Sequence, residues 1–179
     1  MIDLSQLARR NIQVVMNNCY ILLGTNLGDK QSNLQKVIIH LENEVGRIIK
    51  SSSVFQTEPW GRSEQDVFLN QVLKIETMFN SLEVLTLSLD IEVRMGRIRK
   101  EKWMDRIIDI DILYFNQEIY YSPELVVPHP EIQNRRFTLE PLVEISPNYI
   151  HPVLNKTNKE LLGECGDPLQ VEILILDQA

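Results

Sequence analysis

The sequence contains little cysteine and no long apolar run, and these two absences exclude several classes of protein. Its two cysteines, Cys19 and Cys165, are too few and too far apart in the chain for a disulfide framework, so we expect both to be reduced. The longest apolar stretches, such as residues 19–23, are far too short to cross a bilayer. The N-terminal residues have no apolar core followed by a small-residue cleavage site, which is unlike a secretory signal. We therefore expect a cytoplasmic protein without a membrane partner.

An excess of basic residues is also lacking. Lys and Arg total 18 against 25 Asp and Glu, so the formal net charge is −7, whereas nucleic-acid-binding domains are usually basic. The sequence has no Ser-His-Asp order and no Cys/His cluster, so covalent catalysis is not indicated. We expect an N-terminal extension over residues 1–18, which are polar and weakly patterned, and a single domain over residues 19–179. Met16 is an alternative start of translation.

Hydrophobic periodicity predicts four main strands and two main helices. The strands are expected over residues 20–24, 48–57, 68–77 and 107–115. The first helix begins near Asp29 or Ser32 and ends at Gly46, and the second begins after Asn80, where Glu83 matches a capping box. The apolar stripe of the second helix is predicted to be Leu82, Leu85, Leu89 and Val93.

The order of these elements is β-α-β-β-α-β, which predicts an α+β protein with a ferredoxin-like core and an antiparallel sheet. Weaker patterns predict extra strands over residues 118–121, paired with residues 112–115, and over residues 125–127. A short C-terminal helix is expected over residues 138–144, and the tail VEILIL is interpreted as a final strand or a partner-binding edge.

Residues 94–111 combine a cluster of basic side chains with two carboxylates. Asp109 and Asp111 lie in the alternating run IIDIDILYF, so both carboxylates are expected on one face of a strand, roughly 6.5 Å apart. At an effective dielectric of about 20, two charges at that distance repel by about 2.5 kcal/mol, which a cation must offset. Mg²⁺ commonly takes one or two carboxylates together with substrate phosphates, which the basic side chains also suit. The spacing is equally compatible with a structural network of ion pairs to Arg97, Arg99 or Arg106.

Three other segments carry groups that suit a ligand. Residues 24–29 follow a strand and open a helix, which is compatible with a phosphate loop, although a simple glycine turn is the favoured interpretation. Phe68 and Asn70 share a face of a predicted strand and suit a heterocycle, but a core phenylalanine beside a turn asparagine is more common. His129 lies between two prolines that stiffen its backbone, and a lone histidine is usually structural.

The ordered motifs of the chain resemble those of one family. They are YILLGTNLGD, TEPWG followed by FLN, GRIRK followed by W-x-x-R, DIDILYF, and VPHP followed by NRRF, between about residues 20 and 147. Together they resemble the 6-hydroxymethyl-7,8-dihydropterin pyrophosphokinases of folate biosynthesis. The resemblance implies a ferredoxin-like fold and Mg²⁺-dependent transfer of pyrophosphate from ATP to the hydroxymethyl group of the pterin, giving AMP and the pterin diphosphate.

The resemblance also implies a set of site residues. Two Mg²⁺ ions are expected on Asp109 and Asp111, and Asp111 is the best-placed candidate for a general base. The catalytic set implied by the family is Arg97, Arg106, Asp109 and Asp111. The implied ATP site comprises Glu92, Arg97, Arg99, Trp103, Arg106, Ile112, Leu125, Val126, His129 and Arg135. The implied pterin site comprises Phe68 and Phe137 on either side of the ring, Asn70 as its hydrogen-bond partner, and backbone groups near Thr57 and Trp60.

The chain departs from the family pattern in the basic segment. Met104 and Asp105 stand where a Gly-Pro pair is common, and the stretch between Gly96 and Trp103 is one residue shorter than in a known form. A phospho- or nucleotidyltransferase with another acceptor, and a non-catalytic ferredoxin-like binding module, are the alternative functions. We expect small-molecule partners only, ATP and the pterin, and a monomer or a weak homodimer.

Overall fold

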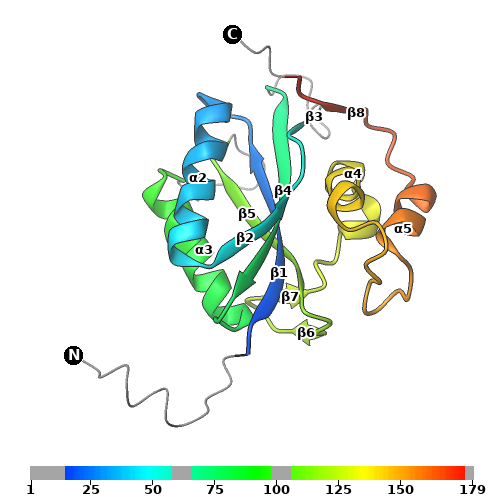
Figure 1. The fold of residues 1–179 in the computed structure, drawn as a ribbon. Helices are drawn as coiled ribbons and strands as arrows, with labels where there is room; N and C mark the ends of the chain where they lie inside the picture. Colours follow the sequence, from blue (N-terminus) through cyan, green and yellow to red (C-terminus); the bar gives the residue numbers. More distant parts are fainter. Residues whose placement is uncertain (1–14, 58–65, 98–105, 176–179) are drawn as a thin grey trace, which may run out of the picture.

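The computed structural model describes residues 15–57, 66–97 and 106–175. Within these ranges the chain forms a six-stranded sheet in the order β5-β1-β4-β3-β8, and β2 also pairs with β4 (Figure 1). Its strands are β1 (Asn17–Thr25), β2 (Arg47–Ser51), β3 (Phe55–Thr57), β4 (Phe68–Thr77), β5 (Asp109–Phe115) and β8 (Val171–Ile173). The five strand pairs of this sheet are antiparallel. The α+β ferredoxin-like core predicted from the order of the elements is therefore confirmed.

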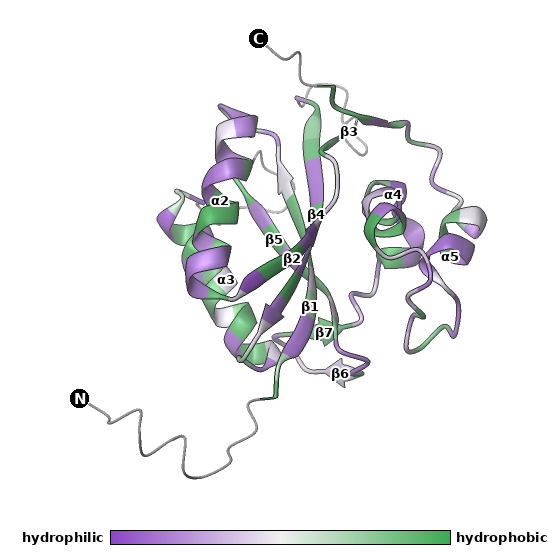
Figure 2. Cartoon of the chain, viewed as in Figure 1, coloured by the Kyte–Doolittle hydropathy of each residue, from purple (hydrophilic) through white to green (hydrophobic). Residues whose placement is uncertain are grey.

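Helices cover both faces of the sheet (Figure 1). The helices α2 (Lys30–Glu44) and α3 (Ser81–Arg94) lie on one face, and α4 (Arg136–Ile145) and α5 (Asn158–Glu164) lie on the other. Alternate residues of β1 divide between the two cores, because Ile21 packs in the cluster that includes α2 and α3, whereas Leu22 packs in the cluster that includes α4 and α5. Figure 2 shows the matching alternation of hydrophobic and hydrophilic residues along the helices.

Local sequence signals explain where α2 and α3 begin and end. The Asp29 side chain caps α2 by accepting the Ser32 N–H at 3.0 Å. The capping box of Asn80 and Glu83 is present at the start of α3, as predicted. After α2, a Cβ at Gly46 would lie 2.3 Å from the Glu76 carbonyl oxygen, so only glycine permits this close approach to β4.

The predicted apolar stripe of α3 is correct only in part: Leu85 packs against the core and Leu89 is partly buried. Leu82 and Val93 are exposed, and the helix instead buries Ser81, Val84, Ser88, Ile91 and Glu92. The leucines suggested a stripe because several of them follow the helical period, but packing selected the neighbouring face. This rotation matters for the site, since it turns the Glu92 carboxylate inward.

Two expected strands also differ in the structure. Residues 48–57 form two strands because the Ser52 hydroxyl, its N–H and its carbonyl all bond to β4, which interrupts the ladder. The short strand β6 (Tyr120–Tyr121) pairs with β7 (Val126–Val127) and not with residues 112–115 as expected. The 3-10 turn η2 (Ile132–Asn134) leads into α4, which tolerates Pro141 within its length.

The remaining expectations about the chain as a whole concern its ends, its cysteines and its helices. The strand β1 begins at Asn17, inside the range assigned to the N-terminal extension, whose residues 1–14 lie outside the described part. Cys19 and Cys165 are both free thiols, as expected. No helix among the described residues has the length and apolar character needed to span a membrane.

Candidate active site

The two aspartates lie together at one end of β5. Ile110 and Ile112 pack into the core on the α2–α3 side, so the alternating Asp109 and Asp111 face the opposite side, toward α4. The predicted shared face of the two carboxylates is therefore confirmed. Both side chains are only partly exposed, which makes any interaction between their charges stronger than it would be in water.

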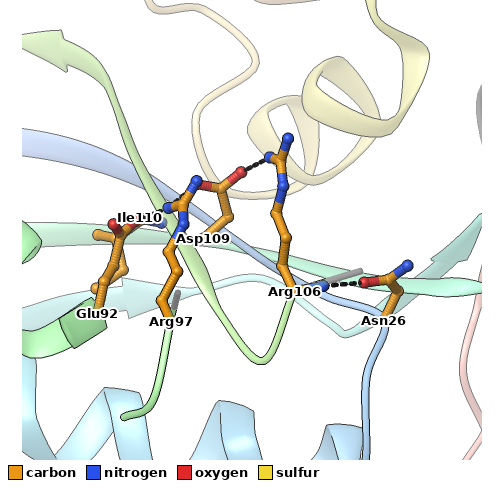
Figure 3. Close-up of polar contacts among 6 residues, drawn as sticks. All are labelled: Asn26, Glu92, Arg97, Arg106, Asp109 and Ile110. Carbon is orange, nitrogen blue, oxygen red and sulfur yellow. Dashed lines mark hydrogen bonds and ion pairs between the residues drawn. The ribbon is translucent and has the colours of Figure 1, made fainter. Parts of the chain in front are cut away.

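Two arginines contact the carboxylate of Asp109 from different parts of the chain (Figure 3). Arg97, just after α3, donates to Oδ1 of Asp109, and Arg106, just before β5, donates to Oδ2. The side chain of Asp109 is 17% exposed, and that of Arg97 is 16% exposed. The ion pairs left open as an alternative to metal binding are thus present at Asp109.

Glu92 holds this cluster through hydrogen bonds to Arg97 and to the backbone of β5. Its side chain is 2% exposed, and Oε1 accepts hydrogen bonds from Arg97 and from the Ile110 N–H, the latter at 2.8 Å. Burial disfavours the charge on Arg97, but the carboxylates of Asp109 and Glu92 outweigh that effect and raise the pKa of Arg97. Glu92 therefore joins α3, Arg97 and β5 into one rigid unit.

Asp111 is in a different electrostatic position from Asp109. It accepts no hydrogen bond from any described residue, and its burial, followed by the charge of Asp109, raises its pKa to about 7. Arg135 and Arg106 act in the opposite direction but do not compensate. The Asp111 carboxylate forms no ion pair with a described residue, and a bound cation would stabilise its ionised form. Among the described residues no third His, Cys, Asp or Glu completes a metal-binding group, so a metal here would need ligands from substrate or water.

A row of three residues across the sheet connects this cluster with Asn70. Gly24 of β1 pairs with Asn70 of β4 on one side and with Asp109 of β5 on the other. A Cβ at Gly24 would lie 3.4 Å from Oδ1 of Asn70 and 3.9 Å from Cβ of Asp109. The missing side chain of Gly24 therefore leaves the sheet surface open between the amide and the carboxylate.

The residues predicted to bind a ring lie on the same side of the sheet. Asn70 is buried, and its Nδ2 donates to the Thr57 hydroxyl at 2.8 Å, which fixes the orientation of the amide. Phe68 and Asn70 are two residues apart in β4 and share the face toward α4, as predicted. Phe137 lies in the first turn of α4, where the Arg135 guanidinium is 5.8 Å from its ring centroid.

The other predicted ATP residues surround the free edge of β5. The His129 N–H bonds to the Leu113 carbonyl at 2.9 Å, and burial together with the Arg135 charge lowers the pKa of His129 to about 4, so this imidazole is neutral at pH 7. Ile112 and Leu125 are buried in the core on the α2–α3 side, and Val126 is partly exposed beside them. Three predicted site residues lie outside the described part of the chain: Trp60, Arg99 and Trp103.

The contact of Asn26 with Arg106 was not predicted from the sequence. Residues 24–29 were expected to form a phosphate loop or a simple turn, whereas Asn26 is 1% exposed and hydrogen-bonds to the backbone of Arg106. The partners are 80 positions apart in the chain, so no local signal could have revealed the contact.

Comparison with known proteins identifies the family to which the chain belongs. The model of the family described as 7,8-dihydro-6-hydroxymethylpterin-pyrophosphokinase matches residues 20–147. A protein of Aquifex aeolicus, named 2-amino-4-hydroxy-6-hydroxymethyldihydropteridine pyrophosphokinase, is 42% identical over 149 residues, which cover 83% of this chain and 92% of that protein. A Bacillus subtilis protein of the same name is 41% identical over 132 residues, which cover 73% of this chain and 79% of its own length.

Solved structures support the same fold. A Plasmodium falciparum HPPK-DHPS structure aligns with a TM-score of 0.69 at 19% sequence identity, over 86% of this chain and 46% of that chain. The present chain thus spans a little under half of the longer protein, and the likeness concerns the fold. The sequence matches are what define the family: this chain belongs to the 7,8-dihydro-6-hydroxymethylpterin-pyrophosphokinase family.

Proposed function

We propose that this chain transfers pyrophosphate from ATP to 6-hydroxymethyl-7,8-dihydropterin, as its family and its relatives' names indicate, and that the transfer occurs between Asn70 and Asp109. The observation that carries the location is the row of Asn70, Gly24 and Asp109. It joins an amide suited to a heterocycle with a carboxylate cluster suited to a metal and phosphates.

The reaction exchanges one phosphorus–oxygen bond for another. The hydroxymethyl oxygen of the pterin bonds to the β-phosphorus of ATP, the bond from that phosphorus to the oxygen bridging to the α-phosphorus breaks, and AMP leaves with the bridging oxygen. The hydroxyl proton is released. Such a transfer needs little covalent chemistry from the protein, because positioning and charge neutralisation dominate catalysis.

The chemistry of the two aspartates fits Mg²⁺. They are hard oxygen donors on one face of a strand. Burial, followed by the charge of Asp109, raises the pKa of Asp111, and a cation would favour its ionised form. We assign both expected Mg²⁺ ions to Asp109 and Asp111. When bound, the metal would neutralise phosphate charge and lower the pKa of the attacking hydroxyl.

Arg97 and Arg106 are proposed to bind the triphosphate of ATP. Arg97 and Arg106 contact Asp109, and their guanidinium groups would also suit phosphate oxygens of the triphosphate. Glu92 holds Arg97 in place. The remaining proposed ATP residues are Ile112, Leu125, Val126, His129 and Arg135, with Arg99 and Trp103 outside the described residues.

The acceptor side uses uncharged groups. Nδ2 of Asn70 donates one N–H to the Thr57 hydroxyl, and Oδ1, on the side of Gly24, is placed to accept from an N–H of the pterin. Phe68 and Phe137 provide stacking surfaces for its ring. Trp60, outside the described residues, completes the proposed set. We expect the protein to act in the cytoplasm on these small molecules as a monomer or weak homodimer.

An assay of the nucleotide products tests the function. Purified protein is incubated with ATP, Mg²⁺ and 6-hydroxymethyl-7,8-dihydropterin, and the nucleotides and pterins are separated by chromatography. We expect AMP and pterin diphosphate in equal amounts, and no AMP when the pterin is omitted. Formation of ADP, or AMP that does not depend on the pterin, would reject the proposal. No turnover with retained ATP binding would favour a transferase for another acceptor.

A further inference from the structure

A reciprocal pair of hydrogen bonds holds the backbone of Arg106. The Asn26 N–H donates to the Arg106 carbonyl at 3.1 Å, and Oδ1 of Asn26 accepts the Arg106 N–H at 2.7 Å. Figure 3 shows this contact at the root of the arginine side chain, on the opposite side from its contact with Asp109. Asn26 thus fixes both polar groups of Arg106 that flank its Cα.

The turn that carries Asn26 is itself held in several ways. Asn26 directly follows β1, and the Asn33 side chain of α2 donates to the Leu27 carbonyl at 2.9 Å. The Asp29 side chain caps α2 two residues further on. Because the turn is tied to both β1 and α2, Asn26 is a rigid support for Arg106.

We propose that Asn26 is a positioning residue for the transfer reaction, which acts by fixing the backbone from which Arg106 reaches Asp109 and the phosphates. The inference rests on the proposed function and adds a residue that does not touch substrate. A guanidinium accelerates the transfer only if it lies where negative charge develops on the phosphates. The backbone of Arg106 must therefore be held in a fixed position. A displacement of about 1 Å at a catalytic group can lower the rate by roughly 10²-fold.

The same chain contains a matched pair at the other end of the β1–β5 pairing. The Asn116 N–H donates to the Asn18 carbonyl at 2.7 Å, and Oδ1 of Asn116 accepts the Asn18 N–H at 2.8 Å. This pair has the same pattern of hydrogen bonds, but within the described ranges neither Asn18 nor Asn116 belongs to an ion pair or contacts an arginine. Asn116 has a φ of 46°, so Asn116→Gly removes the side chain without straining the backbone.

A double-mutant cycle tests the proposal. Asn26→Ala, Arg106→Ala and the double variant are compared with wild type in the AMP assay, and Asn116→Gly is the matched control. We expect Asn26→Ala to lower kcat by about 10- to 100-fold, and to change it by less than about twofold when Arg106 is already alanine. We expect Asn116→Gly to lower the melting temperature and leave kcat within about twofold of wild type.

Two outcomes would overturn the proposal. One is an unchanged kcat in Asn26→Ala with a lowered melting temperature, which is what a purely structural role predicts. The other is a loss that persists in full in the Arg106→Ala background. If Asn26→Ala does not fold, Asn26→Ser, whose hydroxyl is one bond shorter, takes its place in the cycle.

Amide hydrogen exchange separates this inference from the proposed function. In Asn26→Ala we expect faster exchange at the Arg106 N–H and unchanged exchange at the Ile110 N–H, which Glu92 holds. This readout does not depend on turnover. A wild-type protein that makes no AMP would reject the proposed function, whereas unaltered exchange at Arg106 would reject the support by Asn26.

Discussion

The pairing of β1 with β5 ends in the same reciprocal asparagine contact at both ends, but the surroundings of the two ends are opposite. At the far end, defined by Asn18 and Asn116, the Tyr149 hydroxyl donates to the Asn116 carbonyl, and the Tyr149 ring lies 4.5 Å from that of Tyr114. At the site end, defined by Asn26 and Arg106, the neighbours are charged. The same asparagine–backbone contact therefore lies beside aromatic packing at one end and beside a cluster of charges at the other.

The two ends differ in what they contribute to stability. Aromatic pairs at the far end add about 0.5–1.5 kcal/mol beyond the area that they bury. At the site end the ion pairs of Arg97 outweigh its desolvation, whereas the buried Asp111 carboxylate has no such pair among the described residues. The far end thus adds aromatic packing to the fold, while the site end includes one carboxylate, that of Asp111, whose charge burial disfavours.

The largest expected difference between the ends is the effect of Asp109→Asn on activity. The substitution removes a proposed metal ligand and the shared partner of Arg97 and Arg106, and we expect kcat to fall by about 10²- to 10³-fold or more. The measurement is AMP formation at saturating ATP and pterin.

Asp90→Asn is the matched control for this prediction. Asp90 also pairs with an arginine, Arg94, at 2.9 Å, but on the exposed surface of α3. We expect wild-type kcat in this variant. If Asp109→Asn retains most of its activity, Asp109 serves only in ion pairs and the site is wrongly placed.

The pH dependence of stability should also distinguish the two ends. The folded pKa of Asp111 is raised from 3.8 to about 7, so the folded state holds its proton more tightly than the unfolded state does. The stability contributed in this way is fully present below about pH 4 and is lost as the pH rises toward 7, by at most about 1.4 kcal/mol per pH unit. Asp111→Asn should remove this slope.

Urea unfolding between pH 4.5 and 8 in the presence of a chelator measures this effect. The difference in free energy of unfolding between wild type and Asp111→Asn should grow with pH and level off above about pH 7. We expect added Mg²⁺ with ATP to reverse part of the loss at pH 8, because the cation favours the ionised carboxylate. Parallel profiles for the two proteins would show that Asp111 does not titrate in this range.

The smallest expected effect belongs to the far end. Tyr149→Phe removes the hydrogen bond to the Asn116 carbonyl and should lower the free energy of unfolding by about 0.5–1.5 kcal/mol, with kcat unchanged. Thermal unfolding and the AMP assay measure the two quantities. Tyr121→Phe, at a tyrosine that is 87% exposed, is the control and should change neither. A loss of kcat in Tyr149→Phe would mean that the two ends are coupled.

The sequence predicted those features that depend on neighbouring residues. The capping box of Asn80 and Glu83, the shared face of Asp109 and Asp111, and that of Phe68 and Asn70 all follow from local spacing, and all are confirmed. The ferredoxin-like core followed from the order of the elements along the chain. These features were accessible because the period of a helix or strand relates residues a few positions apart.

Features that depend on packing between distant segments were not accessible. Two positions of the α3 stripe were misplaced because Leu82 and Val93 fit the helical period as well as Val84 and Ile91 do, and only packing against the sheet decides between them. The support of Arg106 by Asn26 requires the register of β1 against β5, which is known only from the folded chain. The ion pairs at Asp109 likewise needed the ends of α3 and β5 to be brought together.

Gly24 has a consequence for the choice of substrate. Neighbouring strands lie about 4.8 Å apart, so the row from Asn70 through Gly24 to Asp109 places the Cα atoms of Asn70 and Asp109 roughly 10 Å apart. That separation is set by backbone hydrogen bonds, which change little between proteins, and not by flexible side chains. For the proposed transfer, the sheet therefore sets the distance between the two residues, and we expect an acceptor with a longer or shorter arm to react more slowly.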